Sequence, residues 1–290
     1  MYIVSCVRSD LPYILSGDRL AVIDPHERYF DATTHAWNFA RHPNVINDLR
    51  AHFEPFIGMF GCSLRQLEAG HFSGTIFRFP LRTRASALCD RLYDAERVTR
   101  LFDGFQGDAH LLLLFLKSLE HIELYERDAF QATPTLVFET RLANDVIDLV
   151  RHRRQQFIER CTRNTWLNEP AFTSYAVVIE TLKHEKRTVV KETYKSLVTN
   201  YMVGGATSAI FRKLCADPEL HNSPWVGAAM PLDDSGVECQ GHVFCFLPLP
   251  QLERSPTALN FHVNGYFAVS QDRCASATCC ILYFLHTYIR

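Results

Sequence analysis

Hydrophobic positions along this chain recur with the period of strands in some stretches and of helices in others. Residues 11–16 and 19–23 are apolar, β-prone runs separated by Gly17-Asp18. Two such runs joined by a two-residue turn that opens with Gly predict a β-hairpin. Pro25 ends the second strand, because proline cannot donate a backbone hydrogen bond to the ladder. The β-branched and aromatic residues of 74–81 predict a further strand, and Gly74 permits close approach of backbone or ligand.

The same patterns predict the remaining elements. Helical spacing of apolar residues favours helices over 45–53, 84–105, 108–117 and 145–162. The last of these is expected to bury Val146, Leu149, Val150, Phe157 and Ile158. Strands are predicted over 122–126, 136–140, 244–247 and 259–263, with a hairpin over 176–182 and 189–198 joined at 184–187. Asn264-Gly265 is a strong turn signal after the last strand.

Two segments resemble a known architecture. Residues 73–82 (Ser-Gly-Thr-Ile-Phe-Arg-Phe-Pro-Leu-Arg) and 16–27 are similar to the closing strands of a GHKL-type nucleotide-binding α/β sandwich. With Phe60-Gly61-Cys62, residues 241–250 and residues 260–267, they resemble the sacsin family. That family is built from repeats of a domain related to the ninety-kilodalton heat-shock chaperone. The resemblance runs from about Asp10 to Arg273, and its motifs are long and rich in aromatic residues.

The resemblance implies an α+β fold and three segments. Residues 1–84 would be the C-terminal part of the GHKL-type ATP-binding sandwich, and 85–273 a mixed sheet-and-helix domain of the sacsin repeat. Residues 274–290 form an apolar, cysteine-rich tail that does not match the family. Complete family members carry an Asn-Ala-Asp-Asp-Ala type helix, an Asp-x-Gly turn and a Gly-rich lid ahead of the hairpin, and this chain has none of them. We therefore expect a truncated or partial product, with either end open to a gene-model artefact.

Thr75, Arg78 and Arg82 are the residues that the resemblance assigns to a remnant nucleotide wall. Thr75 matches the Gly-Thr that reaches adenine through a shared water and carboxylate, but the carboxylate partner is missing here. The alternative is a strand threonine paired with its neighbours. Arg78 and Arg82 lie four apart, which predicts the same strand face, and they could meet a phosphate or be surface arginines beside glutamates. Complete family domains use ATP and Mg; no cofactor is expected for this chain.

Three other polar patterns suggest chemistry only weakly. Cys239, His242 and Cys245 have metal-like spacing, but strand geometry places His242 on the face opposite the two cysteines, which argues against zinc. The run 151–154 (Arg-His-Arg-Arg) could bind an anionic partner, although a solvated helix face partly neutralised by Asp148 and Glu159 is the simpler interpretation. The thirteen histidines show no flanking signature of a Cys/His nucleophile. No metal site or catalytic residue is predicted.

Composition limits the class of protein. A chain of 290 residues with 47% apolar residues can fill two domain cores, and a net charge of −2 gives no reason to expect nucleic acid or an anionic membrane as a partner. The longest apolar runs, 111–116 and 279–285, are too short to span a bilayer. Ten cysteines without a secretory signal indicate reduced thiols, and so a cytoplasmic location.

The family resemblance thus implies a chaperone or co-chaperone module that binds client proteins or partner chaperones in protein quality control, without independent catalysis. One alternative is an ATP-binding ATPase module of the heat-shock type, although a recognisable phosphate loop, Mg ligand and water-activating carboxylate are missing from the sequence. Another is a structural scaffold or a non-functional gene fragment. The aromatic segment 244–267 is the predicted partner surface, with burial in the core as the alternative.

Overall fold

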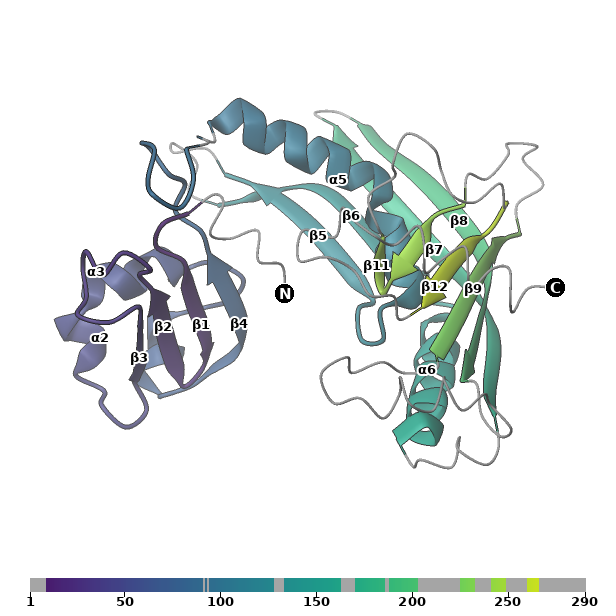
Figure 1. The fold of residues 1–290 in the computed structure, drawn as a ribbon, viewed down its shortest axis with the longest axis horizontal. Coiled ribbons are helices and arrows are strands. Elements are labelled where there is room, and N and C mark those ends of the chain that lie inside the picture. Colours follow the sequence, from purple (N-terminus) through teal and green to yellow (C-terminus); the bar gives the residue numbers. More distant parts are fainter. Residues whose placement is uncertain are drawn as a thin grey trace. The chain divides into compact units, whose positions relative to one another are not determined.

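The computed structural model describes residues 9–90, 92, 94–127, 133–162, 170–185, 188–202, 225–232, 241–248 and 260–265. The chain divides into two compact units, Met1–Asp103 and Gly104–Arg290, and the division falls inside one long helix. Each unit contains a sheet with helices and a hydrophobic core of its own (Figure 1). The predicted α+β class is confirmed. The GHKL origin of the first part and the domain boundary at 84/85 stay predictions.

The first unit is built on an antiparallel sheet with the strand order β3-β2-β1-β4. Its strands are β1 (Tyr13–Gly17), β2 (Arg19–Ile23), β3 (Thr34–Asn38) and β4 (Phe72–Arg78). Ser16 pairs with Arg19, so the turn is Gly17-Asp18, and Gly17 adopts the positive φ of 58° that glycine tolerates. The hairpin is confirmed. Strand β3 was not predicted, and β4 ends earlier than expected, two residues before Pro80.

Short helices pack on this sheet and complete the first core. They are α2 (Val45–Asp48), α3 (Arg50–Phe53), the 3-10 turn η1 (Glu54–Phe56) and α4 (Leu64–Glu68). The helix predicted over 45–53 is interrupted at Leu49, whose φ of −114° and ψ of 32° leave the helical region. Sequence reasoning missed α4, although it begins with a capping box in which Ser63 and Gln66 each accept from the other's backbone amide.

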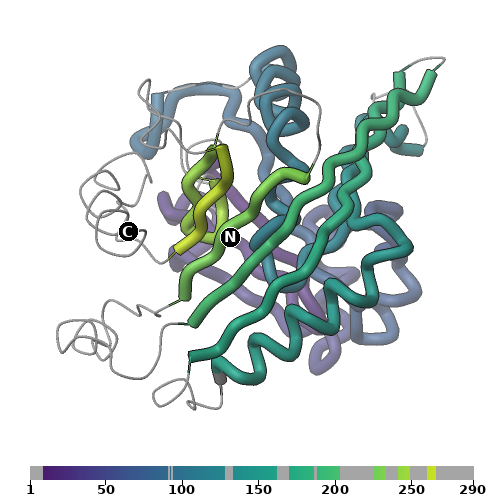
Figure 2. Tube along the Cα trace, turned by 90° about the vertical axis from the view of Figure 1, so that its right-hand side faces the viewer, coloured from purple at the N-terminus to yellow at the C-terminus, as the bar shows by residue number. Residues whose placement is uncertain are grey.

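The second unit is built on an eight-stranded sheet with the order β11-β10-β12-β9-β8-β7-β6-β5. Its strands are β5 (His121–Glu126), β6 (Thr135–Leu142), β7 (Ala171–Glu185), β8 (Thr188–Met202), β9 (Trp225–Pro231), β10 (Val243–Cys245), β11 (Leu247–Pro248) and β12 (His262–Gly265). Pairing is antiparallel except between β10 and β12. Strands β7 and β8 run side by side as one long hairpin (Figure 2). The strands predicted over 122–126 and 136–140 and the hairpin are confirmed, and β7 and β8 extend beyond the predicted limits.

Two helices, α5 (Ala95–Phe115) and α6 (Ile147–Thr162), belong to the core of the second unit. Leu113 and Leu114 of α5 and Val150 of α6 share one buried cluster with Val177 and Val198 of the sheet. We call the side of the sheet that packs against α5 and α6 the inner face, and the opposite side the outer face. Successive side chains of a strand point to the two faces in turn.

The helices predicted over 84–105 and 108–117 are confirmed in part: 95–115 is helical, but it forms the single helix α5, which passes through Gly104 and Gly107, and the residues described between 84 and 94 are not helical. On α6, Val150 and Phe157 are buried as predicted, whereas Leu149 is 49% exposed and that expectation is wrong.

The turn predicted at Asn264-Gly265 is also wrong. Both residues lie inside β12, between β10 and β9. Asn264 is fully buried, and its Oδ1 accepts a hydrogen bond of 2.8 Å from the backbone amide of Phe246. This hydrogen bond and the pairing of β12 with β9 and β10 favour the extended conformation over the turn that the dipeptide favours by itself. Within the described part of the chain, no helix is both long and apolar enough to cross a membrane.

Candidate functional site

Thr75, the first residue of the predicted nucleotide wall, lies on β4 at the edge of the first sheet. Its side chain is exposed, and its Oγ1 lies 2.7 Å from Ser16 Oγ on the neighbouring strand β1. Hydroxyl pairs of this kind stabilise adjacent antiparallel strands. The geometry agrees with the alternative interpretation, a strand threonine paired with its neighbour, and the nucleotide role stays a prediction.

Arg78 and Arg82 do not share a strand face, because β4 ends at Arg78. The guanidinium of Arg78 lies 5.0 Å from the centre of the Tyr13 ring. Arg82 is buried, and its Nε and Nη2 donate to Asp10 Oδ1 at 2.8 and 2.6 Å. The ion pair raises the pKa of Arg82 and lowers that of Asp10. The interpretation of Arg82 as a surface arginine beside glutamates is wrong, since its charge is satisfied inside the first unit.

The outer face of the second sheet carries a group of apolar side chains over β7, β8 and β9. The register places Phe172 beside Tyr201, and Tyr201 beside Val226. Four residues further along β8, beyond Thr199, Leu197 lies beside Met230. Among these, Phe172 is 56% exposed, Met230 49% and Tyr201 38%. We call this group the outer apolar face; its residues are Phe172, Ala176, Leu197, Tyr201, Val226 and Met230.

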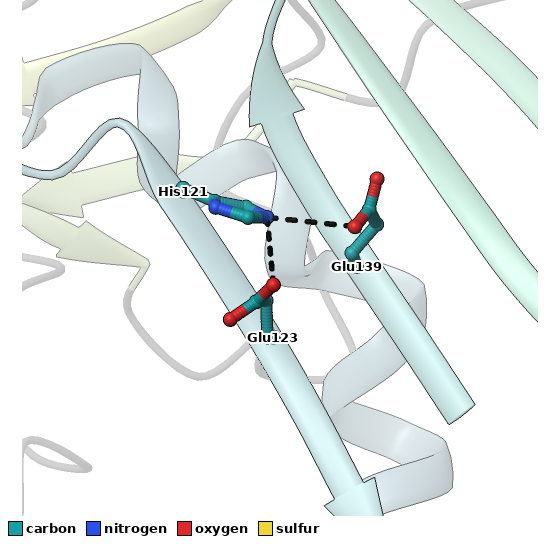
Figure 3. A group of neighbouring side chains, drawn as sticks. All are labelled: His121, Glu123 and Glu139. Carbon is teal, nitrogen blue, oxygen red and sulfur yellow. Dashed lines mark ion pairs between the residues drawn. The ribbon is translucent and has the colours of Figure 1, made fainter. Parts of the chain in front are cut away.

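The outer face over β5 and β6 is charged instead. His121 Nε2 lies 3.6 Å from Glu123 Oε1 and 3.7 Å from Glu139 Oε2 (Figure 3). One ligand atom from each residue falls within 4.8 Å of the other two, which is the size of a metal-binding cluster. Arg141 contacts the other oxygen of Glu139 at 3.4 Å. This set combines one imidazole nitrogen with two carboxylate oxygens, all of them recognised ligand types of divalent metals.

Two comparisons with known proteins bear on this geometry. Residues 7–139 match the family model of the Sacsin domain. In an alignment of length 281 that covers 91% of this chain, the sequence is 34% identical to human sacsin. The chain belongs to the sacsin family. It spans 6% of the length of human sacsin, so the activity and partners of the whole protein are matters of proposal for this chain.

The Sacsin-domain match places the candidate residues in one continuous segment. It contains Thr75, Arg78 and Arg82 of the predicted wall, and all three residues of the His/Glu cluster. The outer apolar face lies beyond it, in the part of the chain that the sacsin alignment covers as a whole. The resemblance stated from the sequence is thereby confirmed at the level of the family.

The basic run of α6 is only partly a solvated face in this sacsin-family chain. Arg151 is exposed and pairs with Glu120 at 2.8 Å and with Asp148 at 2.9 Å. Arg154 is buried and donates to the backbone carbonyls of Leu113 and Leu119 and to the hydroxyl of Tyr175. The interpretation of 151–154 as a solvated face is therefore wrong for Arg154, which joins α6 to the end of α5.

The aromatic segment predicted as a partner surface is partly core: Phe244 and residues 262–265 are buried, residues 245–248 and Phe261 are half-buried, and Asn260 is exposed. Phe244 is fully buried, and its ring meets Phe115 of α5 edge-on at 5.0 Å. His262 and Val263 of β12 are buried as well. The prediction of a surface is wrong for these residues and the alternative, burial, is confirmed; residues 249–259 and 266–267 lie outside the described part of the chain.

Two of the histidines belong to the inner core. His110 of α5 stacks on Tyr194 with ring centres 3.9 Å apart, and burial lowers its pKa to about 4. His262 Nδ1 accepts from the backbone amide of His242, and burial likewise lowers its pKa to about 4. Both rings are neutral at physiological pH. The prediction that His242 points away from Cys239 and Cys245, and that the three residues therefore bind no zinc, stays a prediction, because Cys239 lies outside the described residues.

Lys117, just after α5, lies against two aromatic rings, a contact that was not predicted from the sequence. Its Nζ lies 4.4 Å from the centre of the Trp225 ring and 5.6 Å from that of Phe246. Burial lowers the pKa of this amine. A cation over aromatic rings is attracted by their negative faces. The contacts make Lys117 a structural link between the end of α5, strand β9 and the bend between β10 and β11.

Of the three residues in the His/Glu cluster, only His121 and Glu123 could be expected from the sequence to lie together. His121 and Glu123 are two apart in a predicted strand, which places them on one face. Glu139 joins them because it pairs directly with Glu123 in the β5–β6 register. That register depends on the loop between the strands and on an irregularity at Leu124/Tyr125, and neither could be derived from the residue pattern.

Proposed function

We propose that this sacsin-family chain is a chaperone-like module that binds client proteins or partner chaperones in the cytoplasm and has no catalytic activity of its own. The observation that carries the proposal is the outer apolar face. Large apolar side chains that remain exposed in a contiguous group mark interaction sites more often than single exposed hydrophobic residues do. Neither nucleic acid nor membrane is part of the proposal.

The chemistry of this face suits non-native protein segments. Aromatic and methionine side chains offer large contact area, and methionine adapts to partners of different shape. Ser174 and Thr199 lie between the two apolar rows, and their hydroxyls are 3.1 Å apart, so they already satisfy each other. The face therefore presents apolar surface without an unpaired polar group at its centre, which favours binding of exposed hydrophobic segments over folded polar surfaces.

We propose that the chain has no independent catalytic activity because two residues of the predicted nucleotide wall, Thr75 and Arg82, already bond to other side chains. Arg82 would have to leave Asp10 to reach a phosphate, and Thr75 already pairs with Ser16. Breaking a buried charge pair is costly because the remaining charge stays desolvated. The ATP-binding alternative is favoured by one feature only, the Gly74-Thr75 strand at the edge of the first sheet.

Suppression of aggregation tests the binding proposal. The purified chain should slow the aggregation of a heat-denatured model enzyme, and the variant F172S/M230S should lose most of this effect. The matched control is L149S, which removes an equally exposed apolar side chain from α6, away from the outer apolar face. Equal suppression by all three proteins would contradict a role for this face.

Calorimetry with Mg·ATP and Mg·ADP, together with a thermal melt, tests the second part. We expect no saturable heat and a cooperative melt that nucleotide does not shift. Saturable binding at micromolar affinity with a raised melting temperature would restore the ATP-binding alternative. Absence of both binding and a cooperative transition would favour the non-functional fragment.

A further inference from the structure

The charged part of the outer face contains a ligand set that client binding does not explain. We propose that His121, Glu123 and Glu139 bind a zinc ion that ties the edge strand β5 to β6. The three donor atoms are His121 Nε2, Glu123 Oε1 and Glu139 Oε2. They project from neighbouring strands toward a common point, as Figure 3 shows.

The separations match the size of a zinc ion. Bonds of about 2.0–2.2 Å in tetrahedral geometry place two ligand atoms roughly 3.4 Å apart. The imidazole nitrogen lies 3.6 and 3.7 Å from the two carboxylate oxygens, so these separations are a few tenths of an ångström from that value. The ligand oxygens of Glu123 and Glu139 lie within 4.8 Å of each other, and water would take the fourth position.

The sheet itself places the two carboxylates in an unfavourable pair. Glu123 and Glu139 are directly opposite each other in the β5–β6 register. Like charges in such positions destabilise a sheet unless a cation lies between them. Arg141 faces Glu139 Oε1 and also contacts Glu180 at 3.3 Å, so its charge is divided between β6 and β7. The space between Glu123 and Glu139 is left to His121.

The outer partners hold the ligand oxygens in place. Arg141 contacts Glu139 Oε1, which leaves Oε2 turned toward His121. Tyr125 hydrogen-bonds Glu123 through its hydroxyl. Glu139 is 9% exposed and forms ion pairs with His121 and Arg141. Hydrogen-bonding partners behind the ligands are typical of built metal sites.

Nitrogen in the ligand set decides the class of metal. Imidazole favours zinc and other late transition metals, whereas magnesium and calcium prefer oxygen ligands alone. The expected role is structural: the ion replaces a repulsive cross-strand pair with a bridge and stabilises the outermost strand of the sheet. No reaction is assigned to it.

The test is a zinc titration of the full chain, followed by calorimetry, in parallel with H121N, E139Q and the control E126Q. Glu126 is an exposed carboxylate of the same strand outside the cluster. Because other histidines and cysteines can bind zinc, the decisive quantity is the number of sites. The wild-type chain and E126Q should show one site more than H121N and E139Q, or an affinity higher by at least about tenfold.

Hydrogen exchange locates the ion independently. Zinc should slow exchange of the backbone amides of 121–126 in the wild-type chain and E126Q, but not in H121N or E139Q. Equal stoichiometry and affinity in all four proteins, no zinc binding by the wild-type chain, or displacement by millimolar magnesium would each overturn the proposal. The exchange pattern without zinc shows whether each variant is folded.

Discussion

The two faces of the eight-stranded sheet differ in where their polar side chains lie and in what those side chains contact. On the inner face, α5 and α6 cover the strands, and polar side chains such as the buried Arg154 and the half-buried His110 have defined partners. On the outer face, the apolar group over β7–β9 and the charged group over β5–β6 are separate. Since α5 and α6 occupy one face, the other can carry side chains that the fold does not need for its core.

This difference indicates where stability and where binding reside. Removing the partner of a buried polar group lowers the free energy of unfolding by more than the intact hydrogen bond contributes to it. Exposed apolar and charged side chains contribute little to folding in comparison. Substitutions on the inner face should therefore change the free energy of unfolding, and substitutions on the outer face should change binding. The following predictions test that division, from the largest expected effect to the smallest.

Replacing Arg154 with Met should have the largest effect. The change removes hydrogen bonds to the carbonyls of Leu113 and Leu119 and to the Tyr175 hydroxyl, and it leaves buried acceptors unpaired. The expected loss is about 2–4 kcal/mol in the free energy of unfolding. Urea unfolding measures it, with R153M as the control at the exposed neighbouring position. A loss no greater than that of R153M would contradict the structural role of Arg154.

The pH dependence of stability should come in part from His110. Burial keeps its pKa at about 4 in the folded chain, while the ordinary value is 6.5. Between these values the unfolded chain binds a proton that the folded chain does not, so stability is full above pH 6.5 and falls as the pH is lowered. The contribution approaches about 1.4 kcal/mol per pH unit. Asp108 and Glu192 oppose the shift, and His242 adds to it.

The variant H110F keeps the ring on Tyr194 and removes the titrating group. We expect a shallower fall of the unfolding free energy between pH 6.5 and 4 than in the wild-type chain, measured by urea unfolding at several pH values. H152Q on α6 serves as the control for the removal of an exposed histidine. An unchanged slope in H110F would show that His110 does not titrate as its burial implies.

Glu123→Gln tests the charged part of the outer face. Without metal, the substitution relieves the repulsion from Glu139 and should stabilise the chain by about 0.2–1 kcal/mol. With zinc present, the order should reverse, because the wild-type chain gains binding energy that the variant lacks. Thermal melts of both proteins, with a chelator and with zinc, show whether the order of the two melting temperatures reverses. A variant that is less stable under both conditions would contradict the repulsive pair.

The outer apolar face should matter least for stability. F172S/M230S changes exposed side chains, so the free energy of unfolding should stay within about 0.5 kcal/mol of the wild-type value at each position. Binding of a hydrophobic dye to the folded chain should fall at the same time. A large loss of stability would mean that this face is part of the core, and the division between the two faces would not hold.

Local patterns predicted much of the fold. The hairpin at Gly17-Asp18, the β7–β8 hairpin and the class of the protein followed from alternation and turn residues. Strand β3 was missed because Thr34–Asn38 has no alternating pattern of its own; it forms by pairing with β2. The apolar spacing predicted two helices, over 84–105 and 108–117, but α5 is continuous from Ala95 to Phe115. Predictions from local propensity failed where contacts with a neighbouring strand or helix stabilised a different conformation.

The candidate sites were less predictable than the fold. The sequence identified Thr75, Arg78 and Arg82 through the family resemblance, but the burial of Arg82 depends on Asp10, seventy-two positions away. It identified the basic run on α6, but which arginine enters the core depends on the end of α5. Charge and spacing are visible in a sequence; the partner that satisfies a charge is not.

The sequence by itself determined the family, the α+β class and the positions of most strands, because these depend on residues near one another in the chain. The tertiary structure decided the strand order, the single helix α5, the core role of Phe244 and Asn264, and the meeting of Glu123 with Glu139. Those features depend on register and packing between distant segments. A shift of one residue in register would move every side chain of a strand to the other face, and with it both groups on the outer face of the sheet.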